Sequence, residues 1–141
     1  MLGFVGRDVI FSLRPHYAEN IVSGAKTVEL RRRFAGEAVI GSTAFLYACA
    51  PVKAIIGYAE IADVRRLTLE DIWSQYGESA CIRRCDFDKY FDGLKCGYAI
   101  VLQNAKRLRT MAQAHDLRER FGFRAPQSYS YASQAYGSLI A

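Results

Sequence analysis

The sequence lacks long apolar runs and has very few histidines. No apolar run approaches the ~18 to 20 residues of a membrane span, so no contact with a membrane is expected. Residues 1–13 show no basic segment followed by a long apolar one, so we expect no signal peptide and a cytoplasmic location. With only His16 and His115 available, a catalytic triad that depends on histidine is not expected.

Cysteine pairs with the spacing of metal ligands are also missing. The four cysteines are Cys49, Cys81, Cys85 and Cys96. Only Cys81 and Cys85 are close in sequence, and their spacing of i, i+4 is not a C-x-x-C pair. A zinc site needs about four well-placed ligands. The sequence therefore predicts reduced, partly buried thiols, no metal site and no cofactor.

The bulk composition is that of a small basic domain with an ample core. The chain has 141 residues, which predicts one domain over 1–141, with 122–141 as an aromatic tail or a closing strand. Hydrophobic residues make up 51% of the sequence and aromatic residues 13%. The net charge of +5 and the pI of about 9.1 favour a polyanionic partner such as nucleic acid.

Short elements of both kinds follow one another along the chain. Apolar runs predict strands, and helical spacing, a Thr68 cap and glycine stop signals predict helices. The expected strands are 8–13, 26–33, 43–48, 52–64 and 97–103, with a weak strand in 35–42. The expected helices are 15–23, 68–76, 86–91 and 112–121. Helices that do not alternate one for one with strands indicate an α+β fold or a small barrel.

The segment 12–33 carries the most informative residues. Alternation along a strand places Val28 and Leu30 on one side and Glu29 and Arg31 on the other. Charged side chains on a strand that also serves a core are costly to desolvate. We therefore expect this cluster, which includes Lys26, to be either solvated or used for binding.

The segments RPHYAENIVSGAKTVELRRR, LYACAPVKAIIGYAEI and RAPQSYSY resemble the activating-signal-cointegrator homology (ASCH) domain family. The family pattern GxKxxExR appears here as Gly24, Lys26, Glu29 and Arg31. The resemblance implies a PUA-like fold, which is a small mixed β-barrel of about five or six strands with flanking short helices. It also implies a charged cleft around the motif and a ligand that is RNA, a nucleotide or DNA.

Nine side chains are candidates for contact with nucleic acid. Arginine forks match phosphate geometry, aromatic rings stack on bases, and short polar groups read base edges. Tyr47 is the preferred stacking ring because it lies near the Pro51 turn, whereas Tyr17 is expected to pack in the core. The candidates are Arg14, Lys26, Glu29, Arg31, Arg33, Tyr47, Gln127, Ser128 and Tyr129.

Each candidate also has a purely structural interpretation. Glu29 can simply pair with Arg31, the arginines can be a solvated strand end, and 127–129 can belong to a strand that pairs with the barrel. We rank phosphate contact by Arg31 and Arg33 somewhat above the solvated alternative.

An enzymatic function is the main alternative to binding. Some relatives are similar to an amidohydrolase of N4-acetylcytidine that uses a lysine and a threonine three residues later, and others are ribonucleases. Lys26 matches the lysine, but Glu29 stands at the threonine position and Thr27 faces the other side of the strand. If the chain is an enzyme, Lys26 and Glu29 are the candidate catalytic residues. A third alternative is a protein-interaction module that uses the aromatic tail 129–136.

Overall fold

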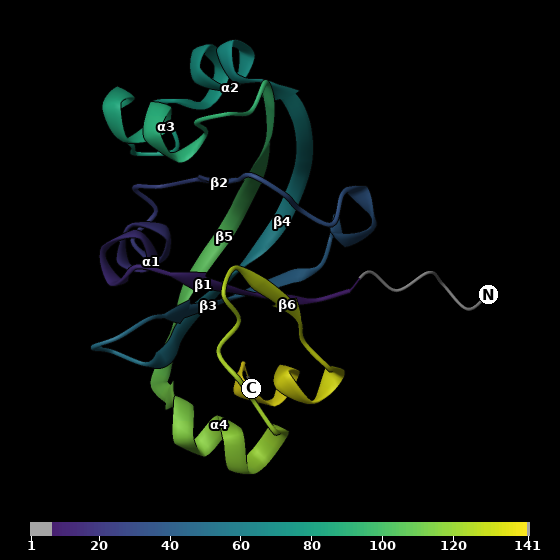
Figure 1. Ribbon diagram of the computed structural model, residues 1–141. Coiled ribbons are helices and arrows are strands. Elements are labelled where there is room, and N and C mark those ends of the chain that lie inside the picture. Colours follow the sequence, from purple (N-terminus) through teal and green to yellow (C-terminus); the bar gives the residue numbers. More distant parts are fainter. Residues whose placement is uncertain (1–6, 141) are drawn as a thin grey trace, which may run out of the picture.

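The structure is a computed structural model that describes residues 7–140. Its centre is a six-stranded sheet in the order β2-β5-β4-β3-β1-β6 (Figure 1). The strands are β1 (Val9–Leu13), β2 (Val28–Arg31), β3 (Thr43–Ala48), β4 (Ala54–Thr68), β5 (Cys96–Gln113) and β6 (Tyr129–Tyr131). The pair β1 and β3 is parallel, and every other neighbouring pair is antiparallel.

The sheet is curled into a half-barrel whose two edges are β2 and β6. Short helices flank the sheet, and the mixed α+β fold predicted from the sequence is confirmed. The helices are α1 (Pro15–Val22), α2 (Leu69–Tyr76), α3 (Arg84–Tyr90) and α4 (Ala114–Phe121), with 3-10 turns η1 (Glu37–Val39) and η2 (Gln134–Leu139). Helices α2 and α3 lie at one end of the long strands β4 and β5, and α4 lies at the other (Figure 1). Within residues 7–140, no helix has the length and apolar character needed to cross a membrane.

Local sequence signals account for several element boundaries. The Thr68 side chain accepts a hydrogen bond from the Asp71 backbone amide and caps α2, as predicted. Helix α1 begins with Pro15 at its first turn and is followed by Gly24, which has a φ of +86°. Gly57 lies at an irregularity in the pairing of β4 with β5, as glycine in a strand often does.

The largest difference from the sequence-based expectation is the length of β5. The prediction ended at residue 103, whereas the strand continues to Gln113. Its second half is polar and basic, so apolar patterning does not reveal it. It is held instead by pairing with β4, for example Gly57 with Arg107 and Ile55 with Ala112.

The C-terminal segment joins the sheet and the core. Strand β6 pairs antiparallel with β1, with Phe11 opposite Tyr129. The following turn η2 buries Tyr136 in a hydrophobic cluster with Phe45 and Leu117. The aromatic residues of this segment are therefore used in packing as well as in strand pairing.

Candidate nucleic-acid interface

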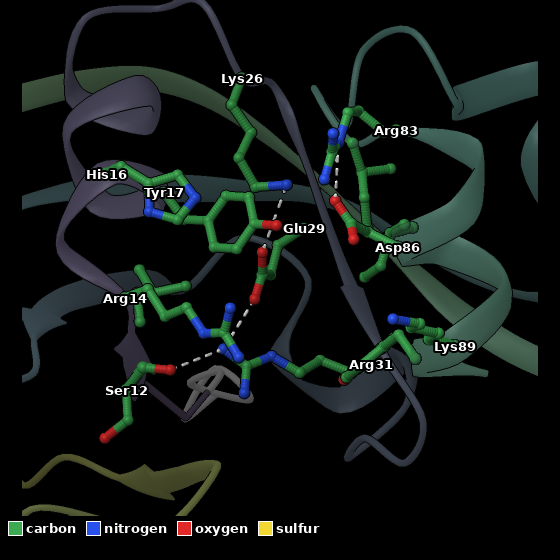
Figure 2. Close-up of a pocket in the computed structure, with 14 residues that line it drawn as sticks. Ser12, Arg14, His16, Tyr17, Lys26, Glu29, Arg31, Arg83, Asp86 and Lys89 are labelled. Carbon is green, nitrogen blue, oxygen red and sulfur yellow. Dashed lines mark hydrogen bonds and ion pairs between the residues drawn. The ribbon is translucent and has the colours of Figure 1, made fainter. Parts of the chain in front are cut away.

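A pocket of about 710 Å³ opens between α1, β2 and the region of α3 (Figure 2). Three segments of the chain form its walls: the end of β1 together with α1, strand β2 together with the preceding Lys26, and residues 82–90. Its lining residues are Ser12, Leu13, Arg14, His16, Tyr17, Lys26, Glu29, Leu30, Arg31, Ile82, Arg83, Asp86, Lys89 and Tyr90.

Strand β2 is buried on both of its faces. Val28 and Leu30 pack in a hydrophobic cluster that includes Phe87 of α3. Glu29 and Arg31 lie on the other face, as the alternation predicted, and both line the pocket. The motif residues are therefore not a solvated strand end: Glu29 and Arg31 are each only 6% exposed.

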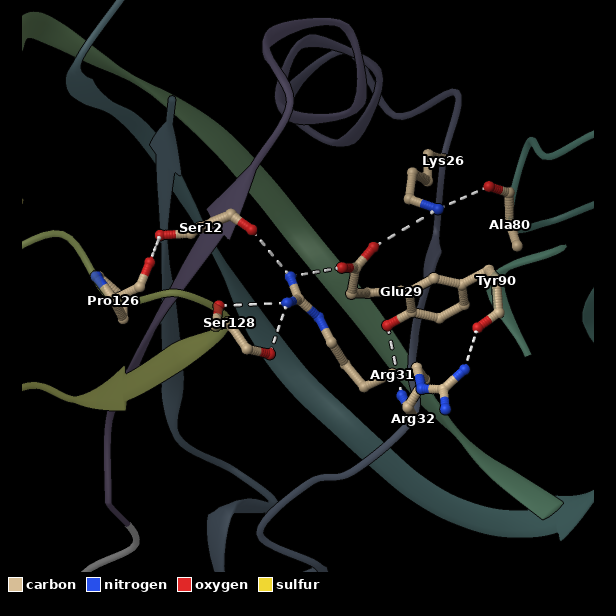
Figure 3. Close-up of polar contacts among 9 residues, drawn as sticks. All are labelled: Ser12, Lys26, Glu29, Arg31, Arg32, Ala80, Tyr90, Pro126 and Ser128. Atoms are coloured by element: carbon tan, nitrogen blue, oxygen red, sulfur yellow. Dashed lines mark hydrogen bonds and ion pairs between the residues drawn. The ribbon is translucent and has the colours of Figure 1, made fainter. Parts of the chain in front are cut away.

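Glu29 lies between two buried cations (Figure 3). Its Oε2 is 2.7 Å from Nη2 of Arg31, and its Oε1 is 3.6 Å from Nζ of Lys26. The pairing of Glu29 with Arg31 that the structural interpretation predicted is thus present, and Lys26 extends it to a triad. Two cations around one carboxylate leave a net positive charge in this part of the pocket.

Lys26 is held by a long-range contact as well as by Glu29. Its Nζ donates to the carbonyl oxygen of Ala80 at 2.6 Å, and its ammonium lies 5.2 Å from the centre of the Tyr17 ring. Burial lowers the pKa of the Lys26 amine, and the nearby Glu29 carboxylate offsets part of that effect. A buried amine of this kind can lose its proton more easily than a surface lysine.

Both terminal nitrogens of Arg31 donate hydrogen bonds to groups of the protein itself (Figure 3). Nη1 donates to the carbonyl oxygen and to Oγ of Ser128, at 3.1 and 2.9 Å. Nη2 donates to the carbonyl oxygen of Ser12 at 3.1 Å and pairs with Glu29. The guanidinium also lies 4.8 Å from the centre of the Phe11 ring. Phosphate contact by Arg31, which the sequence suggested, would require breaking these bonds.

The rim of the pocket adds exposed charge and aromatic rings. Arg14, Arg83 and Lys89 are exposed, and Arg83 pairs with Asp86 at 3.1 Å. Tyr90 is 37% exposed, and its hydroxyl accepts a hydrogen bond from the backbone amide of Arg32. Burial of part of that side chain raises the pKa of the Tyr90 hydroxyl.

Two candidate residues do not reach the pocket. Tyr47 is only 4% exposed and packs 5.1 Å from Phe123, measured between ring centres, in a separate hydrophobic cluster. This placement leaves no free face for stacking on a base. Arg33 follows β2, is exposed and does not line the pocket.

The three candidates near the C-terminus are not part of the pocket lining. Ser128 is exposed and contacts Arg31. Tyr129 is half-buried against Phe34, with ring centres 4.9 Å apart. Gln127 is exposed. Of these, Ser128 has the most direct connection to the motif.

The sequence patterns did not single out four of the lining residues, which are Ser12, Arg83, Lys89 and Tyr90. They reach the pocket through packing between segments about 60 residues apart, and Arg32 to Tyr90 is one such contact. The basic pair Arg83 and Arg84 was the one available signal, but it resembled ordinary surface charge. In the described part of the chain, no cluster of three or more His, Cys, Asp or Glu side chains could hold a metal ion.

The fold is an α+β half-barrel with a pocket beside β2 that is lined by more basic than acidic side chains. The ASCH domain family model matches residues 11–130, and the chain belongs to that family.

Known relatives agree in sequence and in fold. A Zymomonas mobilis protein named "ASCH domain-containing ribonuclease" is 33% identical over 126 residues, covering 89% of this chain and 84% of that protein. The crystal structure of ASCH from Zymomonas mobilis has a TM-score of 0.88 and 31% identity, covering 95% of this chain and 93% of that one. A crystal structure of the ZmASCH S128A mutant from the same organism has a TM-score of 0.87 and 31% identity, covering 94% of this chain and 92% of that one.

Proposed function

We propose that this protein binds single-stranded RNA and takes one nucleotide into the pocket beside β2, which we call the motif pocket. The observation that carries the proposal is the chemistry of the lining: five Lys or Arg side chains against two Asp or Glu, together with two tyrosine rings. The basic groups attract phosphates, and the rings offer surfaces for bases. A relative that is named a ribonuclease supports RNA over other polyanions.

The exposed cations at the rim are the groups best placed for phosphates. Arg14 occupies the N-cap position of α1, and Lys89 extends from α3 on the opposite wall. Both are exposed, whereas Lys26 is committed to Glu29 and Ala80. We assign phosphate contacts to the two rim residues and a contribution of fixed positive charge to Lys26.

The tyrosines of the two walls are the candidates for stacking. Tyr17 of α1 is half-buried beside His16, with ring centres 4.1 Å apart, and Tyr90 of α3 is partly exposed. Stacking of one base on an aromatic ring contributes about 1 to 3 kcal/mol and tolerates any base. We therefore expect binding with weak sequence preference.

A salt titration of RNA affinity tests this function. Fluorescence anisotropy of a short labelled single-stranded RNA gives the affinity at several salt concentrations. Arg14→Ala and Lys89→Ala should each weaken binding and reduce the slope of log affinity against log salt by roughly 0.7, the value for one contact with a single strand. Arg66→Ala, at an exposed position of β4 outside the pocket, serves as the matched control.

Two results would contradict the proposed RNA binding in the pocket. A wild-type protein with no salt-dependent affinity for RNA would overturn the proposal. Equal effects from Arg14→Ala and Arg66→Ala would move binding away from the pocket to general surface charge.

Ribonuclease activity is a second candidate function, favoured by the name of the relative. In RNA cleavage a base removes the proton of a 2′-hydroxyl, its oxygen attacks the phosphorus, and the 5′-oxygen leaves and takes up a proton. Lys26 is our candidate for the base because burial lowers the pKa of its amine. Glu29 would orient it. Thr27 is exposed and outside the pocket lining, which disfavours the amidohydrolase arrangement of lysine and threonine.

A turnover assay distinguishes ribonuclease activity from amidohydrolase activity. Wild type and Lys26→Ala are purified in the same way, and each is incubated with labelled single-stranded RNA and, separately, with N4-acetylcytidine. We expect RNA cleavage that falls by at least about 100-fold in the variant, as the loss of a general base implies. Cleavage that survives in full would remove Lys26 from the reaction.

A further inference from the structure

We propose that Arg31 is a positioning residue that clamps Ser128 at the edge of the pocket and does not itself bind phosphate. Resting on the proposed RNA function, this inference assigns different tasks to two residues that the sequence suggested as equivalent contacts. Arg31 would hold the segment before β6, and Ser128 would meet the RNA.

The hydrogen-bond geometry of Arg31 carries the first step. Each Nη atom of a guanidinium has two hydrogen atoms to donate. Nη1 directs its pair at the two oxygens of Ser128, and Nη2 directs its pair at Ser12 and Glu29. The remaining Nε is buried and has no partner among the described residues. The donors of both Nη atoms are therefore used within the protein, and the one free donor, Nε–H, is buried and not accessible to a phosphate in the pocket.

The position of this clamp in the sheet carries the second step. Arg31 ends β2, and Ser128 immediately precedes β6, so the clamp joins the two edges of the half-barrel. Ser12 of β1 reinforces the contact: its amide donates to the Ser128 carbonyl at 2.9 Å, and its hydroxyl donates to the Pro126 carbonyl at 2.6 Å. The Ser128 backbone is thus fixed from two strands at once.

The chemistry of the Ser128 hydroxyl carries the third step. A serine hydroxyl has one proton to donate and two lone pairs that accept. Arg31 can only donate, so it occupies a lone pair and leaves the hydroxyl proton available. Ser128 is exposed beside the pocket, which allows that proton to be given to a phosphate or base oxygen of bound RNA. The proximity of the cation also strengthens the hydroxyl as a donor.

Arg31→Lys tests the clamp because lysine keeps the positive charge beside Glu29 but lacks the planar fork. We expect RNA affinity to fall by roughly tenfold while the salt slope stays at its wild-type value. Amide hydrogen exchange at Ser12 and in β6 should accelerate, because the Ser128 carbonyl loses its second donor. Arg66→Lys, on exposed β4, is the matched control and should change none of the three readouts.

A double-mutant cycle with Ser128→Ala then tests whether Arg31 acts through Ser128. Ser128→Ala should weaken binding by roughly fivefold, and adding it to Arg31→Lys should cost less than about twofold more. Since Ser128 is exposed and its carbonyl remains, we expect this variant to fold and to keep the wild-type exchange rate at Ser12.

Three results would overturn the clamp: a salt slope reduced by Arg31→Lys, unchanged exchange at Ser12, or additive losses in the cycle. If Arg31→Lys does not fold, a salt slope reduced by Ser128→Ala alone would contradict the assigned hydroxyl contact, and an unchanged slope with weaker binding would support it. A wild-type protein that does not bind RNA contradicts the proposed function. The exchange measurement would still decide whether Arg31 holds Ser128.

Discussion

Glu29 is a buried carboxylate whose two oxygens face different cations. Lys26 and Arg31 share it, and all three side chains are more than nine-tenths buried. Buried ion pairs add little net stability compared with an apolar core, but removal of one member leaves an uncompensated charge. The motif therefore acts as a unit in which each residue depends on the other two.

Glu29→Gln should be strongly destabilising. Without the carboxylate, Lys26 and Arg31 would lie buried with like charge and no counter-ion, at a cost of about 3 to 5 kcal/mol in the free energy of unfolding. Urea unfolding measures that loss. Glu119→Gln, at an exposed position of α4, should change stability by less than about 0.5 kcal/mol. Equal stability of the two variants would show that the triad is solvated.

The lowered pKa of Lys26 makes stability depend on pH. Above that lowered pKa and up to about 10.5, the unfolded chain still holds the proton that the folded protein has released, so stability rises with pH in this window. The difference in unfolding free energy between wild type and Lys26→Met should therefore grow in favour of wild type as pH increases toward 10.5. Cys81 also acts on this amine, so both proteins are compared in a Cys81→Ser background. A difference that stays flat with pH would contradict the assigned shift.

At the scale of elements, α1 is packed directly onto the sheet at Gly57. A Cβ at this position would lie 2.5 Å from the Lys106 carbonyl oxygen and 2.5 Å from a methyl group of Val22. The missing side chain therefore lets α1 approach β4 closely. Because α1 carries His16 and Tyr17, this contact also sets one wall of the pocket.

Gly57→Ala should lower the free energy of unfolding by about 1 to 3 kcal/mol, the usual cost of overpacking. Thermal unfolding measures the change. Gly137→Ala is the matched control, because nothing lies within 4 Å of a Cβ built at that position. If both variants unfold at the same temperature, α1 can move away from the sheet without cost.

Sequence patterns predicted elements well wherever apolar periodicity decided their structure. Strand β3 was predicted with its observed bounds, Thr43–Ala48, and α1 to within one residue. The second half of β5 was missed because residues 104–113 alternate poorly and form a strand only through their pairing with β4. The burial of Lys26 also had no local signal, since its partner carbonyl on Ala80 lies 54 residues away.

At the scale of the whole molecule, the site depends on how the sheet closes. The motif and the side-chain alternation of β2 could be read from the sequence, and both Glu29 and Arg31 line the pocket. The clamp on Ser128 could not be predicted from the sequence, because it joins residues 97 positions apart across the two sheet edges. The wall formed by residues 82–90 depends on the same kind of long-range packing.

Deletion of residues 124–141 tests whether the C-terminal segment is structural. It would remove β6, the buried Tyr136 and the partner of Arg31 together. We expect loss of cooperative unfolding in calorimetry, since β1 becomes an open edge and the buried Arg31 loses both hydrogen bonds of its Nη1 to Ser128. Deletion of 140–141 alone should leave the transition in place. A stable, cooperatively folded deletion product would instead free the tail to bind a protein partner.

The most direct measurement is a crystal structure of the protein with a short single-stranded RNA. Our account predicts a nucleotide between α1 and α3, with a phosphate near Arg14 or Lys89, the Ser128 hydroxyl within hydrogen-bond distance of the RNA, and the Arg31 clamp intact. An RNA bound at the separate groove lined by Arg107, Arg109 and Arg120, with the motif pocket empty, would contradict it.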